Sequence, residues 1–278
     1  MKFLCIIDDN NKLKNKVVNS IKKSSNKYKI NIEFVDLSNV DYINKNSFKD
    51  KQIAVIIACG GDGTIIRSSK LAVKYGIPLV GVNIGHIGFL SSLFSIDDID
   101  FLFEKIYNND YYILKRSMLK SVIYDNDKKL FEDIALNEFT IRSGTVGVIG
   151  KYNLYLSDYD KLFNVYHADG LIISSPTGST GYSFSAGGPI VSSTVNCIII
   201  TPICPHAFNN RSLIIDDKKE IIVEMLTDNQ IVKVDGRRDI ELKKGNKIYI
   251  KKAKEIVSFI TFEKNSFYKN LMTRIKIM

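Results

Sequence analysis

Hydrophobic residues are spaced in two different patterns along this chain. In the first part, apolar runs at residues 3–7, 30–37, 53–58 and 79–82 predict strands, because apolar residues on both faces are typical of a buried parallel sheet. Apolar residues at helical spacing predict helices between these strands, one presenting Leu13, Val17, Val18 and Ile21, and others at residues 65–75 and 97–107. Strands that alternate with helices predict a parallel α/β sheet with ligands at the carboxyl ends of its strands. The polar residues 38–52 are expected to form a loop or an irregular helix.

The spacing of hydrophobic residues changes after Tyr111. Short β-rich segments at residues 118–125, 130–141, 152–156, 221–225, 231–234, 247–251 and 256–262 are separated by clusters of Asn, Asp, Gly and Lys. This pattern favours an antiparallel, sandwich-like second domain. Residues 266–276 carry apolar side chains at helical spacing. We therefore expect an α/β domain over residues 1–110, a β-rich domain over 111–264, and a C-terminal helix over 265–278 that returns to the first domain.

Charge narrows the choice of partner. The formal net charge is +9, and much of the excess lies in a Lys- and Asn-rich stretch over residues 2–49. That stretch lacks the interleaved Arg and aromatic residues of a nucleic-acid surface, so we expect no nucleic-acid partner. A positive field also favours a polyanionic small substrate.

The rest of the composition is that of an ordinary soluble chain. With 278 residues, 45% of them hydrophobic and 25% charged, it is long enough for two cores. The four cysteines form no Cys-x-x-Cys pair, which is typical of a reduced cytosolic protein. No apolar run is long enough to span a membrane, and Met1 leads directly into a strand-like segment. We expect a cytoplasmic protein without a membrane partner.

A glycine-rich turn organises the first part of the chain. The apolar run that starts at Ile53 ends in Gly60, Gly61, Asp62 and Gly63, and a helix-compatible segment follows. One interpretation is an ordinary turn between a strand and a helix. The other is a phosphate-binding loop that carries an acid or base, because glycine lets the backbone approach a ligand and a helix start presents N–H groups to an anion. The spacing is neither Gly-x-Gly-x-x-Gly nor a P-loop.

Three more stretches contain residues that indicate a binding or catalytic role. Residues 83–90 (Asn-Ile-Gly-His-Ile-Gly-Phe-Leu) follow a strand and so lie at the same sheet edge as the glycine-rich turn. The pair Asn137-Glu138 lies in an apolar β run, where an amide and a carboxylate are costly to bury without partners. Residues 167–182 place Asp169 before a strand and a hydroxyl-rich helix start after it, which suits a pyrophosphate or a ribose.

Taken together, these motifs resemble the bacterial type of NAD kinase over nearly the whole chain. Gly-Gly-Asp-Gly-Thr, Asn-x-Gly-x-x-Gly-Phe-Leu, Asn-Glu, Asp-Gly…Ser-Pro-Thr-Gly-Ser-Thr-Gly-Tyr and Thr-Pro-Ile-Cys-Pro-His occur in the order seen in that family. The glycine-rich motif alone is shared with diacylglycerol and sphingosine kinases. The hydroxyl-rich stretch together with Asn-Glu is the specific part.

The resemblance implies that ATP phosphorylates the adenosine 2′-hydroxyl of NAD, with a divalent cation such as Mg²⁺ accompanying ATP. It implies a first domain that binds the ATP phosphates, a second that binds NAD at an inter-domain cleft, and a homodimer or homotetramer. Asp62 is the implied catalytic carboxylate, either as a base or as a metal organiser, and no protein-only metal site is expected. The implied substrate-binding residues are Gly60, Gly61, Gly63, Thr64, Arg67, Asn83, Asn137, Glu138, His167, Asp169, Thr177, Thr180, Gly181, Tyr182, Ser183, Ser185 and Cys204.

Two other functions are compatible with parts of this pattern. A lipid kinase of the diacylglycerol kinase type would share Asp62 but has no use for the Asn-Glu pair. A non-catalytic NAD-sensing module would keep the second-domain motifs without needing Asp62. The chain also departs from the family pattern, with His167 where relatives often carry Arg or Lys and Gly181 where Ala is common.

Overall fold

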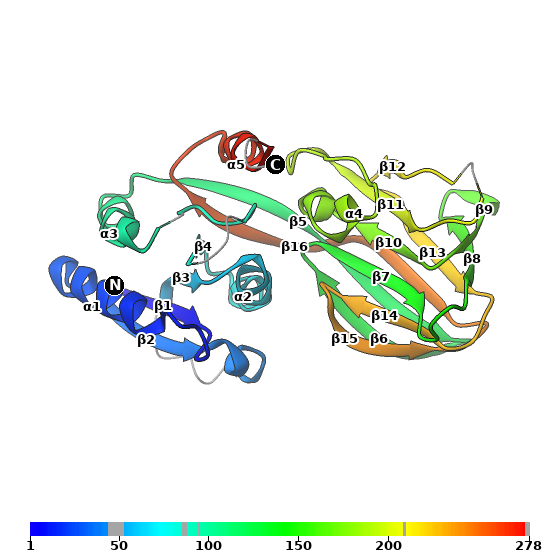
Figure 1. Cartoon of the computed structure of the whole chain (residues 1–278), viewed down its shortest axis with the longest axis horizontal. Helices are drawn as coiled ribbons and strands as arrows, with labels where there is room; N and C mark the ends of the chain where they lie inside the picture. Colours follow the sequence, from blue (N-terminus) through cyan, green and yellow to red (C-terminus); the bar gives the residue numbers. More distant parts are fainter. Residues whose placement is uncertain (44–52, 85–87, 94, 208–209, 276–278) are drawn as a thin grey trace. The chain divides into compact units, whose positions relative to one another are not determined.

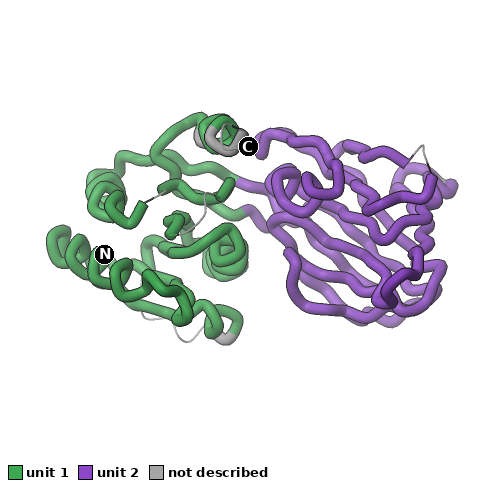
Figure 2. Tube along the Cα trace, in the orientation of Figure 1, with its two compact units in different colours: residues 1–115, 257–278 green, residues 116–256 purple. Residues whose placement is uncertain are grey.

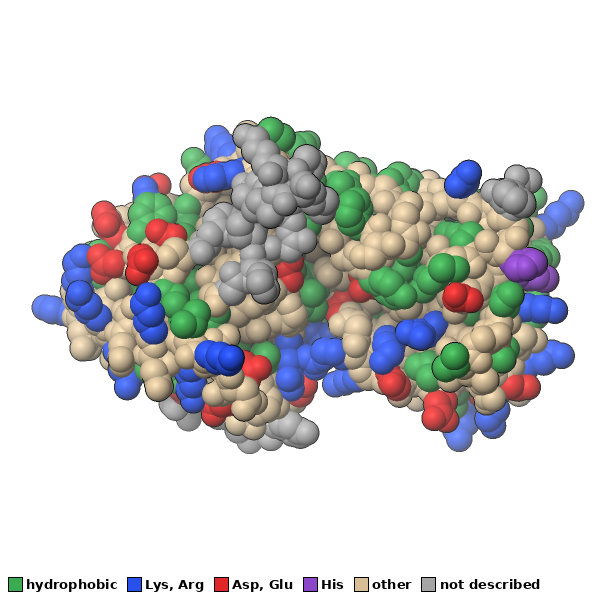
Figure 3. All heavy atoms as spheres, in the orientation of Figure 1, with side chains coloured by type: hydrophobic (Ala, Val, Ile, Leu, Met, Phe, Trp, Pro, Cys, Tyr) green, Lys and Arg blue, Asp and Glu red, His purple; other side chains and the backbone are tan. Residues whose placement is uncertain are grey.

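The computed structural model describes residues 1–43, 53–84, 88–93, 95–207 and 210–275. The chain forms two compact units, unit 1 from residues 1–115 and 257–278 and unit 2 from residues 116–256 (Figure 2). No helix within the described ranges is long and apolar enough to cross a bilayer. On the face drawn in Figure 3, Lys and Arg side chains are interspersed with Asp and Glu.

Unit 1 is built on a parallel sheet. Its strand order is β2 (Asn31–Asp36), β1 (Lys2–Ile7), β3 (Ile53–Cys59) and β4 (Leu79–Val82) (Figure 1). The end of β16 (Lys247–Thr261) continues the sheet, since Phe259 pairs in parallel with Leu79. The predicted parallel sheet is confirmed.

Helices cover both faces of this sheet. The helices α1 (Lys14–Tyr28) and α3 (Ile99–Tyr107) pack on one face, where Phe3, Ile57 and Phe103 share a buried cluster. The helix α2 (Asp62–Tyr75) covers the other face. Its Ile65 side chain lies so close to β4 that a Cβ on Gly81 would be 2.5 Å from the Ile65 Cδ1 atom. The predicted position of Leu13 on a buried helix face is wrong, since this residue precedes α1 and is 42% exposed.

Shorter elements complete unit 1. The 3₁₀ helices η1 (Leu37–Tyr42) and η3 (Ile96–Asp98) precede β3 and α3, while residues 44–52 of the predicted polar segment lie outside the described residues. The C-terminal helix α5 (Ser266–Ile275) returns to unit 1 as predicted. Its Asn270 side chain donates hydrogen bonds to the Phe89 and Ser91 carbonyl oxygens.

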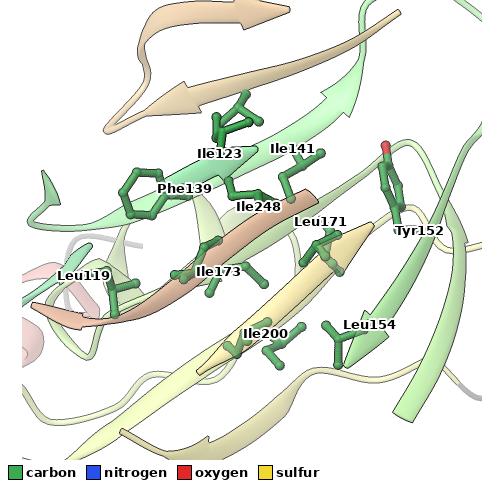
Figure 4. Packing of buried hydrophobic residues seen from close by; sticks show 14 of the residues in the cluster. Leu119, Ile123, Phe139, Ile141, Tyr152, Leu154, Leu171, Ile173, Ile200 and Ile248 are labelled. Atoms are coloured by element: carbon green, nitrogen blue, oxygen red, sulfur yellow. The ribbon is translucent and has the colours of Figure 1, made fainter. Parts of the chain in front are cut away.

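Unit 2 is an antiparallel sandwich. One sheet has the order β12 (Leu213–Asp216), β11 (Cys197–Ile203), β10 (Gly170–Ser174), β7 (Glu138–Ser143), β14 (Gln230–Val234) and β15 (Arg237–Leu242). The other runs from β16 to β13 (Ile221–Met225), β8 (Gly150–Leu156) and β9 (Tyr159–Ala168), and the hairpin of β5 (Tyr112–Asp125) and β6 (Lys128–Ala135) joins it at β16. Side chains from both sheets, including Leu119, Phe139, Ile173, Ile200 and Ile248, meet in one buried core (Figure 4).

Strand boundaries differ from the predicted ones in two places. The predicted run over residues 130–141 is divided, because β6 pairs with β5 in one sheet whereas β7 pairs with β10 and β14 in the other. The predicted segments 247–251 and 256–262 are one strand, β16, because the residues between them also have an extended backbone. The strands β9, β11, β12 and β15 were not among those predicted. The hydroxyl-rich stretch forms a 3₁₀ turn, η4 (Thr177–Thr180), and a short helix, α4 (Tyr182–Ser185).

The sandwich core provides a direct test of these packing assignments. Ile200 on β11 is fully buried, whereas Ile214 on the neighbouring β12 is 53% exposed. We expect Ile200→Ala to lower the free energy of unfolding by about 2–5 kcal/mol, because it removes buried methyl groups and leaves a cavity. Ile214→Ala should change it by less than about 1 kcal/mol. Urea denaturation of both variants measures the difference, and equal losses would contradict the assigned core.

Candidate active site

The glycine-rich turn joins β3 to α2. Gly61 is the N-cap of α2, and its carbonyl oxygen accepts hydrogen bonds from the Thr64 and Ile65 N–H groups. A Cβ on Gly60 would lie 2.2 Å from the Thr64 Oγ1 atom, so only glycine fits there. A Cβ on Gly61 or Gly63 would meet nothing within 4 Å. None of the three has a positive φ, so a left-handed turn does not explain them, and a close approach within the protein explains Gly60 alone.

Asp62 is the first residue of α2, and its carboxylate binds the segment that follows β4. The Phe89 N–H donates to Asp62 Oδ2 at 2.9 Å, and the Leu90 N–H donates to Oδ1 at 3.2 Å. A Cβ on Gly88 would lie 1.9 Å from Oδ1, so the approach requires glycine. The structure therefore brings the Gly-Gly-Asp-Gly-Thr and Gly-Phe-Leu motifs together around one half-buried carboxylate.

Two other predicted residues of unit 1, Arg67 and Asn83, form hydrogen bonds with other residues of the protein. Arg67 on α2 donates to the Ser38 carbonyl oxygen at 3.1 Å and pairs with Asp41 at 2.8 Å. Asn83 is buried after β4, and its N–H donates to the Leu93 carbonyl oxygen at 2.9 Å. Gly85, His86 and Ile87 of the same motif lie outside the described residues.

In unit 2, one carboxylate determines where β6 ends and β7 begins. Asp235 accepts hydrogen bonds from the consecutive N–H groups of Leu136, Asn137 and Glu138, at 3.0, 2.8 and 3.1 Å. The Asp235 N–H in turn donates to the Glu138 carbonyl oxygen at 3.0 Å. Because the carboxylate takes these donors out of the strand ladder, Asn137 lies at a break between two strands. The sequence-based placement of this pair inside one β run is therefore wrong.

The pair carries two unsatisfied polar atoms. Asn137 Oδ1 and Glu138 Oε2 are buried and have no hydrogen-bond partner among the described residues. A Cβ on Gly181 would lie 3.1 Å from Glu138 Oε2 and 3.2 Å from Asn137 Nδ2. Buried polar groups are nearly always hydrogen-bonded in folded proteins. The arrangement is therefore suited to a ligand that offers hydrogen bonds to both residues.

The environment of Glu138 changes its charge state. Burial raises the pKa of the Glu138 carboxyl to about 8, and the negative charge of Asp235 contributes in the same direction. A carboxyl that is protonated at neutral pH can donate as well as accept a hydrogen bond. The pair therefore offers both hydrogen-bonding modes to a polar ligand.

The hydroxyl-rich stretch packs directly against this strand break. The Ser175 N–H donates to the Asn137 carbonyl oxygen at 2.8 Å, and the Ser175 hydroxyl donates to the Leu136 carbonyl oxygen at 2.5 Å. A Cβ on Gly178 would lie 2.3 Å from the Asn137 carbonyl oxygen, so η4 requires glycine there.

The predicted binding residues of this stretch differ in accessibility. Thr177 is buried and accepts a hydrogen bond from Arg116 at 3.4 Å, and the Thr180 hydroxyl donates to the Thr177 carbonyl oxygen at 3.3 Å. The Ser183 hydroxyl is buried against Thr201 Oγ1 at 2.9 Å, so it faces the protein interior. Tyr182 is 40% exposed, and Ser185 is exposed as well.

Three predicted residues lie elsewhere in unit 2. The Asp169 N–H donates to the Ile203 carbonyl oxygen next to Cys204, and the His206 N–H donates to the His167 carbonyl oxygen. The side chains of His167, Asp169 and Cys204 are exposed. Asp169 precedes β10, whereas Glu138 pairs with Ser174 at the other end of that strand. At about 3.3 Å per residue, these two groups are separated by about 13 Å or more.

Two residues beyond the predicted set help to build the site. Asp235 is one of them, and its Asp-Gly pair after an apolar strand was the available signal. Arg116 was not singled out, although a cation in an apolar β run is a signal of a buried polar contact. No group of three or more His, Cys, Asp or Glu side chains in the described ranges is placed to hold a metal ion.

Glu138 gives a testable pH dependence of stability. Its pKa is about 8 in the folded protein and about 4.3 for an unperturbed glutamate. The folded state therefore holds a proton that the unfolded chain loses, and stability falls as pH rises between these values. We expect the melting temperature to decrease from pH 5 to pH 8, and Glu138→Gln to reduce this decrease. The same pH dependence in both proteins would exclude a buried protonated carboxyl.

Comparisons with known proteins agree over most of the chain. The family model described as the ATP-NAD kinase N-terminal domain matches residues 9–111, and the ATP-NAD kinase C-terminal domain matches residues 136–262. A protein named NAD kinase from Thermoanaerobacter sp. (strain X514) is 39% identical over 222 residues, which are 79% of this chain and 77% of that protein. An NAD kinase from Clostridium perfringens (strain 13 / Type A) is 34% identical over 272 residues, or 96% of this chain and 94% of that protein.

Two solved structures share the fold. Yeast NADH kinase complexed with NADH superposes with a TM-score of 0.83 at 20% identity, covering 99% of this chain and 88% of that one. An NAD kinase from Archaeoglobus fulgidus in complex with ATP gives a TM-score of 0.77 at 22% identity, with both chains covered completely. These matches support neither a lipid kinase nor a sensing module. The chain belongs to the family of ATP-dependent NAD kinases.

Proposed function

We propose that this chain transfers the γ-phosphate of ATP to the adenosine 2′-hydroxyl of NAD, with Asp62 as the catalytic carboxylate. The observation that carries the proposal is the position of Asp62 at the start of α2, held by the Phe89 and Leu90 N–H groups beside the open backbone of Gly61 and Gly63. The family membership of the chain supports this assignment.

The reaction needs a positioned proton acceptor. A ribose hydroxyl is a weak nucleophile, and a carboxylate can orient it and accept its proton as the new O–P bond forms. The bond between the γ-phosphorus and the bridging oxygen breaks, and its electron pair leaves with ADP. The two backbone hydrogen bonds hold the Asp62 carboxylate in one orientation, which is the contribution that a fixed catalytic group makes to rate.

Unit 1 binds the phosphates of ATP in this proposal. The backbone around Gly61 and Gly63 is exposed at the beginning of α2, where N–H groups and the helix dipole favour an anion. The oxygen donors of Asp62 fit a hard divalent cation such as Mg²⁺, which takes its remaining ligands from phosphates and water. When bound, such a cation neutralises charge on the phosphates.

Unit 2 binds the dinucleotide. Asn137 Oδ1 and Glu138 Oε2 lack partners among the described residues and contact the adenosine moiety in this assignment. Glycine at position 181 leaves space beside both side chains, because a Cβ there would lie 3.1 Å from Glu138 Oε2 and 3.2 Å from Asn137 Nδ2. Tyr182, which follows Gly181 in the chain, is 40% exposed and so is accessible to the dinucleotide.

A second copy of the chain completes the dinucleotide site. His167 and Asp169 lie at the opposite end of β10 from Glu138, at a separation of about 13 Å or more. Both are exposed, so they are accessible to a second copy of the chain. In a homodimer with two-fold symmetry, each chain contributes these residues to the site of its partner.

The role of Asp62 can be tested by removing the proton acceptor while keeping its shape. Asp62→Asn should lower kcat by roughly 10²–10⁴-fold, because an amide cannot accept the hydroxyl proton. NAD affinity should largely survive. NADP formation from ATP and NAD, followed by a coupled dehydrogenase, measures the rate, and calorimetry measures NAD binding. Turnover near the wild-type value would remove Asp62 from catalysis.

Complementation between copies tests the shared site. Glu138→Ala and Asp169→Ala should each lose most activity at low NAD concentration, because each removes one side of the dinucleotide site. Random assembly of the two co-expressed variants makes about half of the dimers mixed, each with one intact site, so about a quarter of wild-type activity should return. Glu132→Ala, which removes an exposed carboxylate on β6, is the matched control and should stay active alone. No recovery in the mixture would place both residues in one chain's site.

A further inference from the structure

The hydrogen bonds around residues 88–91 extend from the catalytic carboxylate to the C-terminal helix. On one side, the Phe89 and Leu90 N–H groups donate to Asp62. On the other side, Asn270 Nδ2 on α5 donates to the Phe89 carbonyl oxygen at 3.2 Å and to the Ser91 carbonyl oxygen at 3.4 Å. Asn270 is only 4% exposed, although its neighbours on α5, Lys269 and Met272, are exposed.

One peptide group links Asn270 to Asp62. The carbonyl of Phe89 and the N–H of Leu90 belong to the same peptide unit, which accepts from Asn270 at one end and donates to Asp62 Oδ1 at the other. Hydrogen bonds in such a series polarise and strengthen one another. The Asn270 amide therefore both positions this peptide and improves it as a donor to the carboxylate.

The surroundings of this segment are loosely packed on the side of α5. A cavity of about 280 Å³ borders it, lined among others by Ser91, Phe101, Phe262 and Asn270. The Ser91 hydroxyl is buried and has no hydrogen-bond partner within the described ranges. Tight packing normally holds a buried segment in place. The Ser92 and Leu93 N–H groups hold the end of the segment by donating to the Gly81 carbonyl oxygen. On the α5 side a hollow takes the place of packing, so there the Asn270 hydrogen bonds add restraint at Phe89 and Ser91.

We infer that Asn270 is a positioning residue for phosphoryl transfer, which acts by holding the Phe89–Leu90 peptide against the Asp62 carboxylate. This inference rests on the proposed role of Asp62. The C-terminal helix thereby becomes part of the catalytic apparatus without touching a substrate. A loss of the amide leaves both substrates able to bind but allows Asp62 to leave its reactive orientation.

Steady-state kinetics with a matched set of variants tests the inference. Asn270→Asp keeps the shape and replaces the donating NH₂ by oxygen, and it should lower kcat about tenfold, the rate equivalent of about 1.4 kcal/mol or one hydrogen bond. The KM values for NAD and ATP should change by less than about threefold, since no substrate contact is lost. Asn270→Gln should recover part of kcat, because the adjacent cavity has room for one more methylene. Lys269→Ala, on the same helix, should keep wild-type kcat.

A double-mutant cycle separates positioning from folding. If Asn270 acts through Asp62, adding Asn270→Asp to Asp62→Asn should cause little further loss, because the group being positioned is already absent. If Asn270 only stabilises the fold, its loss should be the same in both backgrounds and should follow the melting temperature. An unchanged kcat in Asn270→Asp, or fully additive losses, overturns the inference. A wild-type protein that makes no NADP would instead overturn the proposed function itself.

Discussion

The Asp235 carboxylate is the contact on which the architecture of unit 2 depends. It binds three consecutive N–H groups at residues 136–138, so the chain leaves one sheet of the sandwich there and enters the other. The same contact sets Asn137 and Glu138 at the break rather than in a ladder. Removing the acceptor would leave three buried donors without partners, each costing about 1–3 kcal/mol. The fold of unit 2 and the proposed binding site therefore share one determinant.

In unit 1, the Asp62 carboxylate also binds backbone N–H groups, but its proposed role is catalytic. It accepts from consecutive N–H groups, two of them among the described residues, and Asp62 remains half-buried. Backbone donors fix a carboxylate without adding a side-chain cation that would compete for it. Glu138 is the contrasting case, since burial near Asp235 favours its neutral form. The three acidic groups thus differ in their surroundings because their donors and their exposure differ.

The sequence was most informative where one local rule decided the outcome. Buried strands of unit 1 and the end of α2 at Gly76 follow from apolar runs and from a glycine in the left-handed region, with φ 65°. The division at residues 136–137 could not be predicted, because it depends on Asp235, about a hundred positions away along the chain. The role of Asn270 could not be predicted for the same reason, because an amide in an amphipathic helix gives no local indication of its hydrogen-bond partner. The motif residues remain predictions for ligand contact, and the structure adds the geometry that makes them testable.

The strand β16 has a consequence for how the protein is made. Its first part pairs with β13 in unit 2, whereas Phe259 near its end pairs with Leu79 in unit 1. During synthesis, the sheet of unit 1 and the β13-containing sheet of unit 2 therefore both lack a strand until residues 247–261 have left the ribosome. Pairing between positions so distant in sequence is slow, and an unfinished sheet edge favours aggregation. Nascent chains of this protein should depend on chaperones until β16 emerges, and a truncation that removes β16 should damage both units together.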